Sequence, residues 1–145
     1  MITLEKVAFD TVSIIAAIIA DHPNHARAVI WLQRVQREEI VGIISAHSIA
    51  ETYNVLTGGL KVQPALALKL LEQNVLATFN VIPLTETDYH AVVQHLVSMN
   101  IGGGKIYDGL IAFAAWKAEA DLLLTYNKKH FDAIYPTHAD KIVEP

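Results

Sequence analysis

The amino-acid sequence predicts an α/β fold in which a central, mostly parallel sheet is covered by helices on both faces. Short apolar runs of strand length, such as residues 40–44, alternate along the chain with longer segments whose apolar residues recur at helical spacing. The short runs are apolar throughout, a pattern typical of strands buried on both faces of a parallel sheet. With 145 residues, 52% of them hydrophobic, the chain is long enough for one well-filled core. We therefore expect a single domain over residues 1–145.

The predicted strands are short and rich in branched apolar side chains. They are expected at residues 6–9, 40–44, 79–84, 122–125 and 142–143. Pro83 suits the end of its strand, because proline cannot donate a hydrogen bond to a neighbouring strand. The last of these segments is expected at an edge of the sheet.

The predicted helices fill the segments between the strands and carry start signals. They are expected at residues 11–20, 25–38, 45–59, 64–77, 85–100 and 106–120. Asn24 is expected to cap the second helix, and either Ser45 or Ser48 the third. Thr85 and Asp88 form an approximate capping box at the start of the fifth helix.

The composition excludes several classes of function. A formal net charge of −4 argues against a protein that holds nucleic acid by a broad basic surface. The absence of cysteine excludes disulfides, thiolate metal sites and a cysteine nucleophile. The longest apolar run, residues 12–20, is too short for a membrane span, which needs about 20 residues. We expect a cytoplasmic protein without a membrane segment, and the mean hydropathy of +0.32 fits a chain that buries part of its surface in a partner.

Three acidic residues lie inside separate apolar segments: Asp10, Glu51 and Asp108. A carboxylate in apolar surroundings is costly unless something compensates its charge. Asp10 directly follows the first predicted strand, and open parallel sheets bind ligands beyond the carboxyl ends of their strands. Carboxylate oxygens are the ligands that a hard divalent cation such as Mg²⁺ prefers. The three residues therefore predict a shared acidic pocket for such a cation.

Each of these acidic residues also has a purely structural interpretation. Asp10 can cap the helix that begins at residue 11. Asp108 lies in a first helical turn, where the helix dipole favours a carboxylate. Glu51 lies off the apolar face of its helix and can be solvated. The seven histidines lack a zinc-protease spacing, and the glycines at 102–104 lack the spacing of a Walker phosphate-binding loop.

Three phrases of the sequence, taken in this order, form a specific signal. The first is VAFDTVSIIAAI, in which Asp10 is followed by Thr11. The second is ISAHSIAETYNVLTG, which carries Glu51. The third is IYDGLIAFAAWKAEADLLLTYNKKHF, which carries Asp108 and a Thr-x-Asn turn. Together the phrases cover most of the chain, and they resemble the PIN-domain nucleases, most closely the VapC-like ribonuclease toxins.

The resemblance implies a three-layer α/β/α fold and Mg²⁺- or Mn²⁺-dependent cleavage of RNA, with 5′-phosphate and 3′-hydroxyl products. It implies that Asp10 and Asp108 are metal ligands and that Glu51 completes the acidic catalytic site. Thr11 or Ser13 is expected to orient Asp10 or to hydrogen-bond a phosphate. The resemblance further implies an antitoxin protein as partner and a homodimer.

The loop after the fourth predicted strand departs from the family pattern. Many family members carry a fourth acidic residue there, where this chain has Asn127 and His130. Asn127 can still orient a ligand or a metal-bound water, but the missing charge leaves the number of metal ions open. Lys105, Lys128 and His130 are candidates for contact with RNA.

The leading hypothesis is therefore a Mg²⁺-dependent endoribonuclease that acts as the toxin of a toxin–antitoxin pair. The missing fourth acidic residue motivates an alternative, a degenerate PIN domain that binds RNA or a protein without catalysis. A phosphotransferase centred on Asp10 is a weaker interpretation, because the phosphatase pattern requires a second aspartate where Val12 stands.

Overall fold

Five strands form one parallel sheet. The computed structural model describes residues 3–145, so that residues 1–2 of the expected 1–145 domain lie outside the described residues. The strands are β1 (Lys6–Phe9), β2 (Val41–Ser45), β3 (Asn80–Ile82), β4 (Leu122–Leu124) and β5 (Ile142–Val143). Their order is β3-β2-β1-β4-β5, and all neighbours pair in parallel. The chain adds β2 and β3 on one side of β1 and β4 and β5 on the other, so that the strand order reverses between β1 and β4.

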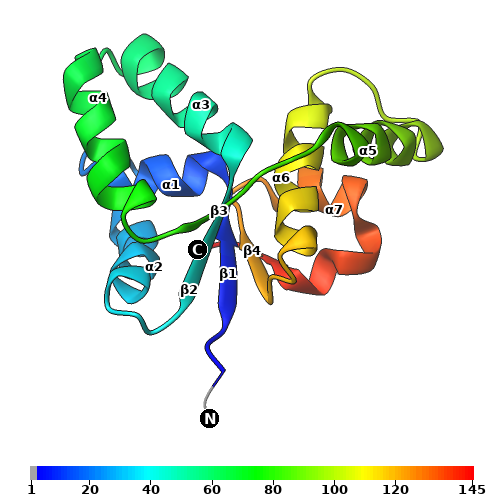
Figure 1. Cartoon of the computed structure of the whole chain (residues 1–145), viewed down its shortest axis with the longest axis horizontal. Helices are drawn as coiled ribbons and strands as arrows, with labels where there is room; N and C mark the ends of the chain where they lie inside the picture. The colour runs from blue at the N-terminus through cyan, green and yellow to red at the C-terminus, as the bar shows by residue number, and fades with distance from the viewer. Residues whose placement is uncertain (1–2) are drawn as a thin grey trace.

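Helices lie on both sides of this sheet (Figure 1). On one side are α1 (Thr11–Ile18), α2 (His25–Gln36), α3 (Ala46–Asn54) and α4 (Pro64–Leu71). On the other side are α5 (Glu86–Ser98), α6 (Lys105–Lys117) and α7 (Lys128–Ile134). Single π-helical segments extend α3 over Val55–Gly59 and α4 over Glu72–Leu76, and a 3₁₀ segment, Pro136–Lys141, precedes β5. The predicted three-layer α/β/α architecture is confirmed.

Alternate side chains of the strands pack into two cores, one on each face of the sheet. Val7 and Phe9 of β1 pack with residues of α1 and α2, whereas Ala8 between them packs with residues of α5 and α6. In the same way Leu124 of β4 belongs to the first core and Leu123 to the second. Because both faces are covered, both sets of side chains must be apolar, which explains the continuous apolar runs in the sequence.

Two predicted helix starts are confirmed by their capping hydrogen bonds. The side chain of Ser45 accepts a hydrogen bond from the backbone N–H of His47 at the start of α3. Thr85 and Asp88 form a complete capping box at the start of α5, each side chain accepting from the other residue's backbone N–H. These caps depend on neighbouring residues alone, so that the sequence is sufficient to find them.

Two expectations about local structure are wrong. Asn24 precedes α2 but its side chain makes no capping hydrogen bond; its backbone N–H donates to Nδ1 of His22 instead. The segment after β4, expected as a loop, contains the helix α7. This helix has seven residues, and it is anchored by burial of Phe131 and Ile134, which lie three residues apart on one face. So short a segment has too little apolar periodicity to be recognised from the sequence.

Gly42 occupies a position in β2 where no side chain fits. A Cβ atom there would lie 2.8 Å from Cδ2 and Cε2 of Phe79 and 2.9 Å from Cγ1 of Val35. We expect Gly42→Ala to lower the free energy of unfolding by about 1–3 kcal/mol, because overpacking a filled core forces its side chains apart. Gly104→Ala is the matched control, since no atom lies within 4 Å of its added Cβ. Urea unfolding of the two variants measures the difference, and equal midpoints would contradict the expectation.

Among the residues that the structure describes, no helix combines the length and the apolar character that crossing a bilayer requires.

Candidate functional site

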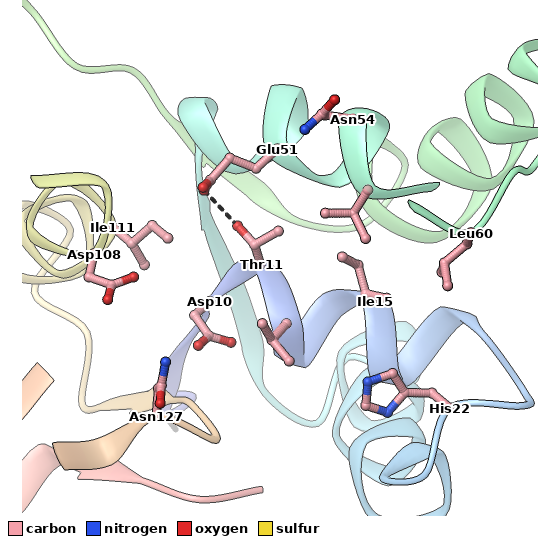
Figure 2. A pocket seen from close by; sticks show the side chains of 12 residues that line it. Asp10, Thr11, Ile15, His22, Glu51, Asn54, Leu60, Asp108, Ile111 and Asn127 are labelled. Carbon is pink, nitrogen blue, oxygen red and sulfur yellow. Dashed lines mark hydrogen bonds between the residues drawn. The ribbon is translucent and has the colours of Figure 1, made fainter. Parts of the chain in front are cut away.

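A cavity of about 380 Å³ lies beyond the carboxyl ends of β1 and β4, where the strand order reverses. Asp10 directly follows β1, and Asn127 lies between β4 and α7. Figure 2 shows Asp10, Asp108 and Asn127 at one end of this pocket and His22 and Leu60 at the other. A crevice at this position is the usual ligand site of an open parallel sheet.

Asp10 lies between β1 and α1 and lines the pocket. Its side chain is only 4% exposed, and its Oδ1 accepts a hydrogen bond of 2.8 Å from the backbone N–H of Ser13. The carboxylate therefore caps α1, as the structural interpretation predicts, and it also lines the cavity. The two roles are compatible because a carboxylate has several acceptor sites and the cap uses one of them.

Ser13 contacts Asp10 from within α1 and does not line the pocket. Its side chain is fully buried, and its hydroxyl donates to the backbone carbonyl oxygen of Leu124 at 3.1 Å. That bond ties α1 to β4. Ser13 thus contacts Asp10 through its backbone N–H, whereas its buried hydroxyl is not placed to reach a phosphate.

Glu51 is held in the pocket by the residue that follows Asp10. The hydroxyl of Thr11 donates to Oε1 of Glu51 at 2.9 Å, and Figure 2 shows this bond crossing from α1 to α3. Thr11 therefore orients Glu51 and not Asp10. Nε2 of His47, one helical turn earlier on α3, lies 3.9 Å from the same carboxylate oxygen. Glu51 is consequently held by the hydrogen bond from Thr11 and is not a freely solvated side chain.

Asp108 enters the pocket from the first turn of α6. It is brought opposite Asp10 by α6, which packs against the sheet through Leu110, Ile111 and Ala112. The sequence places these residues directly after Asp108, so that burial of the helix face directs the carboxylate toward the strand ends. All three predicted acidic residues thus line one cavity, although they come from three separate segments.

The pocket raises the pKa of two of its carboxyl groups. Burial raises the pKa of Asp10 from 3.8 to about 6, against hydrogen bonds from Thr125 and Ser13 that lower it, and the charge of Asp108 adds to the rise. Burial is also the main cause of the raised pKa of Asp108, to which Glu51 adds, while His130 and Lys105 act in the opposite direction. Both carboxylates therefore lack sufficient positive charge around them, which is the condition that a bound cation would relieve.

The donor atoms of the pocket fit a hard divalent cation. Asp10, Glu51, Asp108 and the Asn127 side chain offer oxygen atoms, and Mg²⁺ is commonly held by one or two carboxylates while it keeps several waters. Within residues 3–145, no three histidine, cysteine, aspartate or glutamate side chains form a set that would hold a metal ion together. The pocket therefore fits a cation that is held by few protein ligands. Glu51 already accepts a hydrogen bond from Thr11.

The three residues predicted to contact RNA differ in position. Lys105 and His130 are near enough to Asp108 for their charges to lower its pKa. Lys128 points elsewhere, because its Nζ is paired with Oδ1 of Asp132 at 3.0 Å and with the carbonyl oxygen of Ala139 at 2.8 Å. Asp132 is occupied by this ion pair and does not replace the missing fourth acidic residue.

The far end of the pocket contains residues that sequence reasoning missed. Asn54 and Val55 line it together with His22 and Leu60. The first two stand three and four residues after Glu51, a helical spacing that puts them on the same face and could have identified them. His22 and Leu60 lie outside the regular helices, so that no periodicity in the sequence points to them.

Asp10→Asn is expected to stabilise the chain at neutral pH in the absence of divalent cations. The folded pKa of about 6 exceeds the ordinary 3.8, so the native state holds the Asp10 proton more tightly and this group's contribution to stability falls as pH rises from about 4 to 6. Above pH 6 the penalty is constant, at about 3 kcal/mol for two pKa units. Urea unfolding in EDTA should give the variant a higher free energy of unfolding than the unmutated chain at pH 7.5, and the difference should be smaller at pH 4.5. A difference of the same size at both pH values would contradict the assignment of the effect to ionised Asp10.

Comparison with known proteins agrees with the fold. The PIN domain family matches residues 7–135 of this chain. Ribonuclease VapC27 of Mycobacterium tuberculosis is 33% identical over 118 residues, which are 79% of this chain and 80% of that protein.

Two solved structures are similar in fold. The M. tuberculosis toxin VapC20, described as cleaving the sarcin–ricin loop, has a TM-score of 0.68 at 17% identity over 88% of this chain and 94% of its own. VapBC2 from Rickettsia felis, solved with a DNA fragment from its promoter, has a TM-score of 0.67 at 19% identity over 97% and 98% of the two chains.

Proposed function

This chain belongs to the PIN-domain family, and on that premise we propose that it is a divalent-metal-dependent endoribonuclease, the toxin of a toxin–antitoxin pair. The observation that carries the proposal is the convergence of Asp10, Glu51 and Asp108 on one cavity at the switch in strand order. The ribonuclease name of a relative 33% identical over most of the chain supports RNA as the substrate class.

Asp10 and Asp108 are the residues proposed to hold Mg²⁺ or Mn²⁺. Their carboxylates lie at the same end of the pocket, and burial leaves both short of compensating positive charge. When bound, such a cation supplies charge that offsets the negative charge developing on the phosphate during hydrolysis.

The other polar side chains of the pocket have positioning roles in this proposal. Glu51, held by Thr11, presents a fixed carboxylate that can accept a hydrogen bond from an attacking water. The amide of Asn127 lies beside Asp10 and can donate to a phosphate oxygen or accept from a water (Figure 2). Lys105 places positive charge near Asp108, where an RNA phosphate would approach, and His130 lies near the same carboxylate.

A second candidate function is a binding module without catalysis. Asn127 takes the place of a fourth acidic residue, and the described part of the chain has no ready set of three metal-ligating side chains. Both observations favour weak metal binding. The candidate retains RNA or a protein as ligand and differs from the enzyme in the absence of cleavage.

The proposed protein partners are an antitoxin and a second copy of this chain. The R. felis structure is that of a VapBC assembly, and the chain compared in it has the same fold as this one over nearly its full length. Leu60, Leu66 and Leu68, in and around α4, are about half exposed and offer apolar surface to a partner.

Cleavage of RNA by the purified chain tests the proposed function. An end-labelled RNA incubated with Mg²⁺ or Mn²⁺ should yield discrete fragments with 5′-phosphate and 3′-hydroxyl ends, and EDTA should prevent their formation. Binding of the RNA without any cleavage would favour the binding module. Cleavage that persists unchanged in EDTA would contradict the proposed metal dependence.

A further inference from the structure

Two aromatic rings stack beside the acidic end of the pocket. The rings of His47 on α3 and Tyr107 on α6 have centroids 5.3 Å apart and planes within 7° of parallel. One face of the Tyr107 ring is therefore covered by His47, yet the residue as a whole remains 50% exposed. A large aromatic side chain that is held in one orientation and still half open to solvent has surface to offer to a ligand.

This stacked pair adjoins two of the acidic residues that line the proposed catalytic pocket, Glu51 and Asp108. His47 lies one helical turn before Glu51, and its Nε2 is 3.9 Å from Oε1 of that residue. Tyr107 directly precedes Asp108 in the first turn of α6. The two rings thus come from the same two helices as Glu51 and Asp108, with Tyr107 on α6 stacked on the imidazole that neighbours Glu51.

Electrostatic attraction alone is a poor means for this chain to hold RNA. Its formal net charge is −4, and Lys128 is neutralised by Asp132. The pocket itself carries three carboxylates. Contacts that do not depend on phosphate charge must therefore contribute, and proteins that bind single-stranded RNA obtain them by stacking its bases on aromatic side chains.

We propose that Tyr107, backed by His47, stacks on an unpaired nucleobase of the RNA whose phosphate lies at the acidic pocket. The inference rests on the proposed function and specifies how its substrate is held. The ligand class is a single-stranded or looped segment of RNA, because bases paired within a duplex have no free face to stack. His47 keeps the Tyr107 ring in one orientation, which reduces the conformational entropy lost on binding.

The proposed stacking platform, the Tyr107 ring backed by His47, is tested by steady-state cleavage of a single-stranded oligoribonucleotide that contains the mapped cleavage site. Tyr107→Ala should raise KM about 5- to 150-fold, the range expected for the loss of one base stack, while kcat changes much less. Tyr107→Phe keeps the ring and should behave as the unmutated chain. Tyr89→Ala is the matched control, because Tyr89 is a similarly exposed tyrosine on α5. Equal KM values for Tyr107→Ala and Tyr89→Ala would overturn the proposal.

Abasic substitution of the RNA identifies the stacked base. Each nucleotide flanking the cleavage site is replaced in turn by an abasic one, and at one position the penalty of Tyr107→Ala should disappear. A penalty of the same size on every abasic substrate would mean that the ring acts by supporting His47 and Glu51, which would also overturn the platform.

Salt dependence separates stacking from phosphate contact. Tyr107→Ala should leave the slope of log Kd against log salt unchanged, whereas Lys105→Ala should reduce it by about one unit if Lys105 contacts phosphate.

Failure of the proposed nuclease function is recognised separately, as absence of cleavage by the unmutated chain. In that case fluorescence anisotropy with the same oligonucleotide decides the platform, and binding that is indifferent to Tyr107→Ala overturns it.

Discussion

Asp10→Asn and Asp108→Asn are each expected to lower the rate of RNA cleavage by at least about 100-fold, the scale of losing one group that stabilises a transition state. Asparagine has nearly the shape of aspartate but carries no charge to hold a cation. In Asp10→Asn the side-chain oxygen can still accept the hydrogen bond from Ser13, so that the cap of α1 is kept. The loss should therefore appear in kcat/KM of variants that remain folded.

Asp132→Asn provides the control for these two substitutions. Asp132 is an acidic residue of α7, and it is paired with Lys128 and does not line the pocket. It should retain nearly full activity and lose only the small contribution of an exposed ion pair. Cleavage at the unmutated rate in both Asp10→Asn and Asp108→Asn would remove the acidic pocket from the mechanism, even if the chain still cuts RNA.

Divalent cations are expected to stabilise the folded chain at neutral pH. A ligand that binds only the native state adds about 2.7 kcal/mol to the free energy of unfolding when its concentration is 100 times its dissociation constant. Thermal unfolding with increasing MgCl₂ or MnCl₂ measures the effect, which should vanish in Asp10→Asn and Asp108→Asn and persist in Asp132→Asn. This measurement needs no RNA, so that it distinguishes a metal site without activity from a chain without a metal site.

The stabilisation by divalent cations should also depend on pH. A carboxyl group must lose its proton to bind a metal, and the pKa of Asp10 is raised to about 6. Proton competition should make the increment smaller at pH 5 than at pH 7.5. An increment that is independent of pH, or that is present in all three variants, would mean that the cation binds elsewhere.

The elements of this fold could be predicted from the sequence to within a few residues because they depend on local patterns. The parallel strands are continuous apolar runs, and the Thr85–Asp88 capping box is complete within four residues. The helix α7 escaped prediction because only Phe131 and Ile134 anchor it, and two apolar residues do not establish a period. Asn24 has the right residue type for a cap, but its backbone, at φ −101° and ψ 10°, is not in the extended conformation from which a side chain usually caps a helix.

The three acidic residues of the site were recognisable for a related reason. Each interrupts an apolar segment, and each stands at the start of a helix or within one, where its direction follows from the burial of neighbouring apolar residues. The exposed valine and leucine residues of the pocket are harder to recognise, because in the sequence they resemble core residues. For example, Val12 follows Thr11 in an apolar run, yet it is 44% exposed and lines the cavity.

By itself the sequence determined most of the succession of strands and helices along the chain and the acidic character of the pocket, because periodicity, caps and charges in apolar surroundings are properties of short segments. Only the tertiary structure decided which side chains meet there: Thr11 with Glu51, and His47 with Tyr107. These partners belong to helices far apart in the chain, and their contact depends on how the helices pack on and around the sheet. No local pattern carries that information.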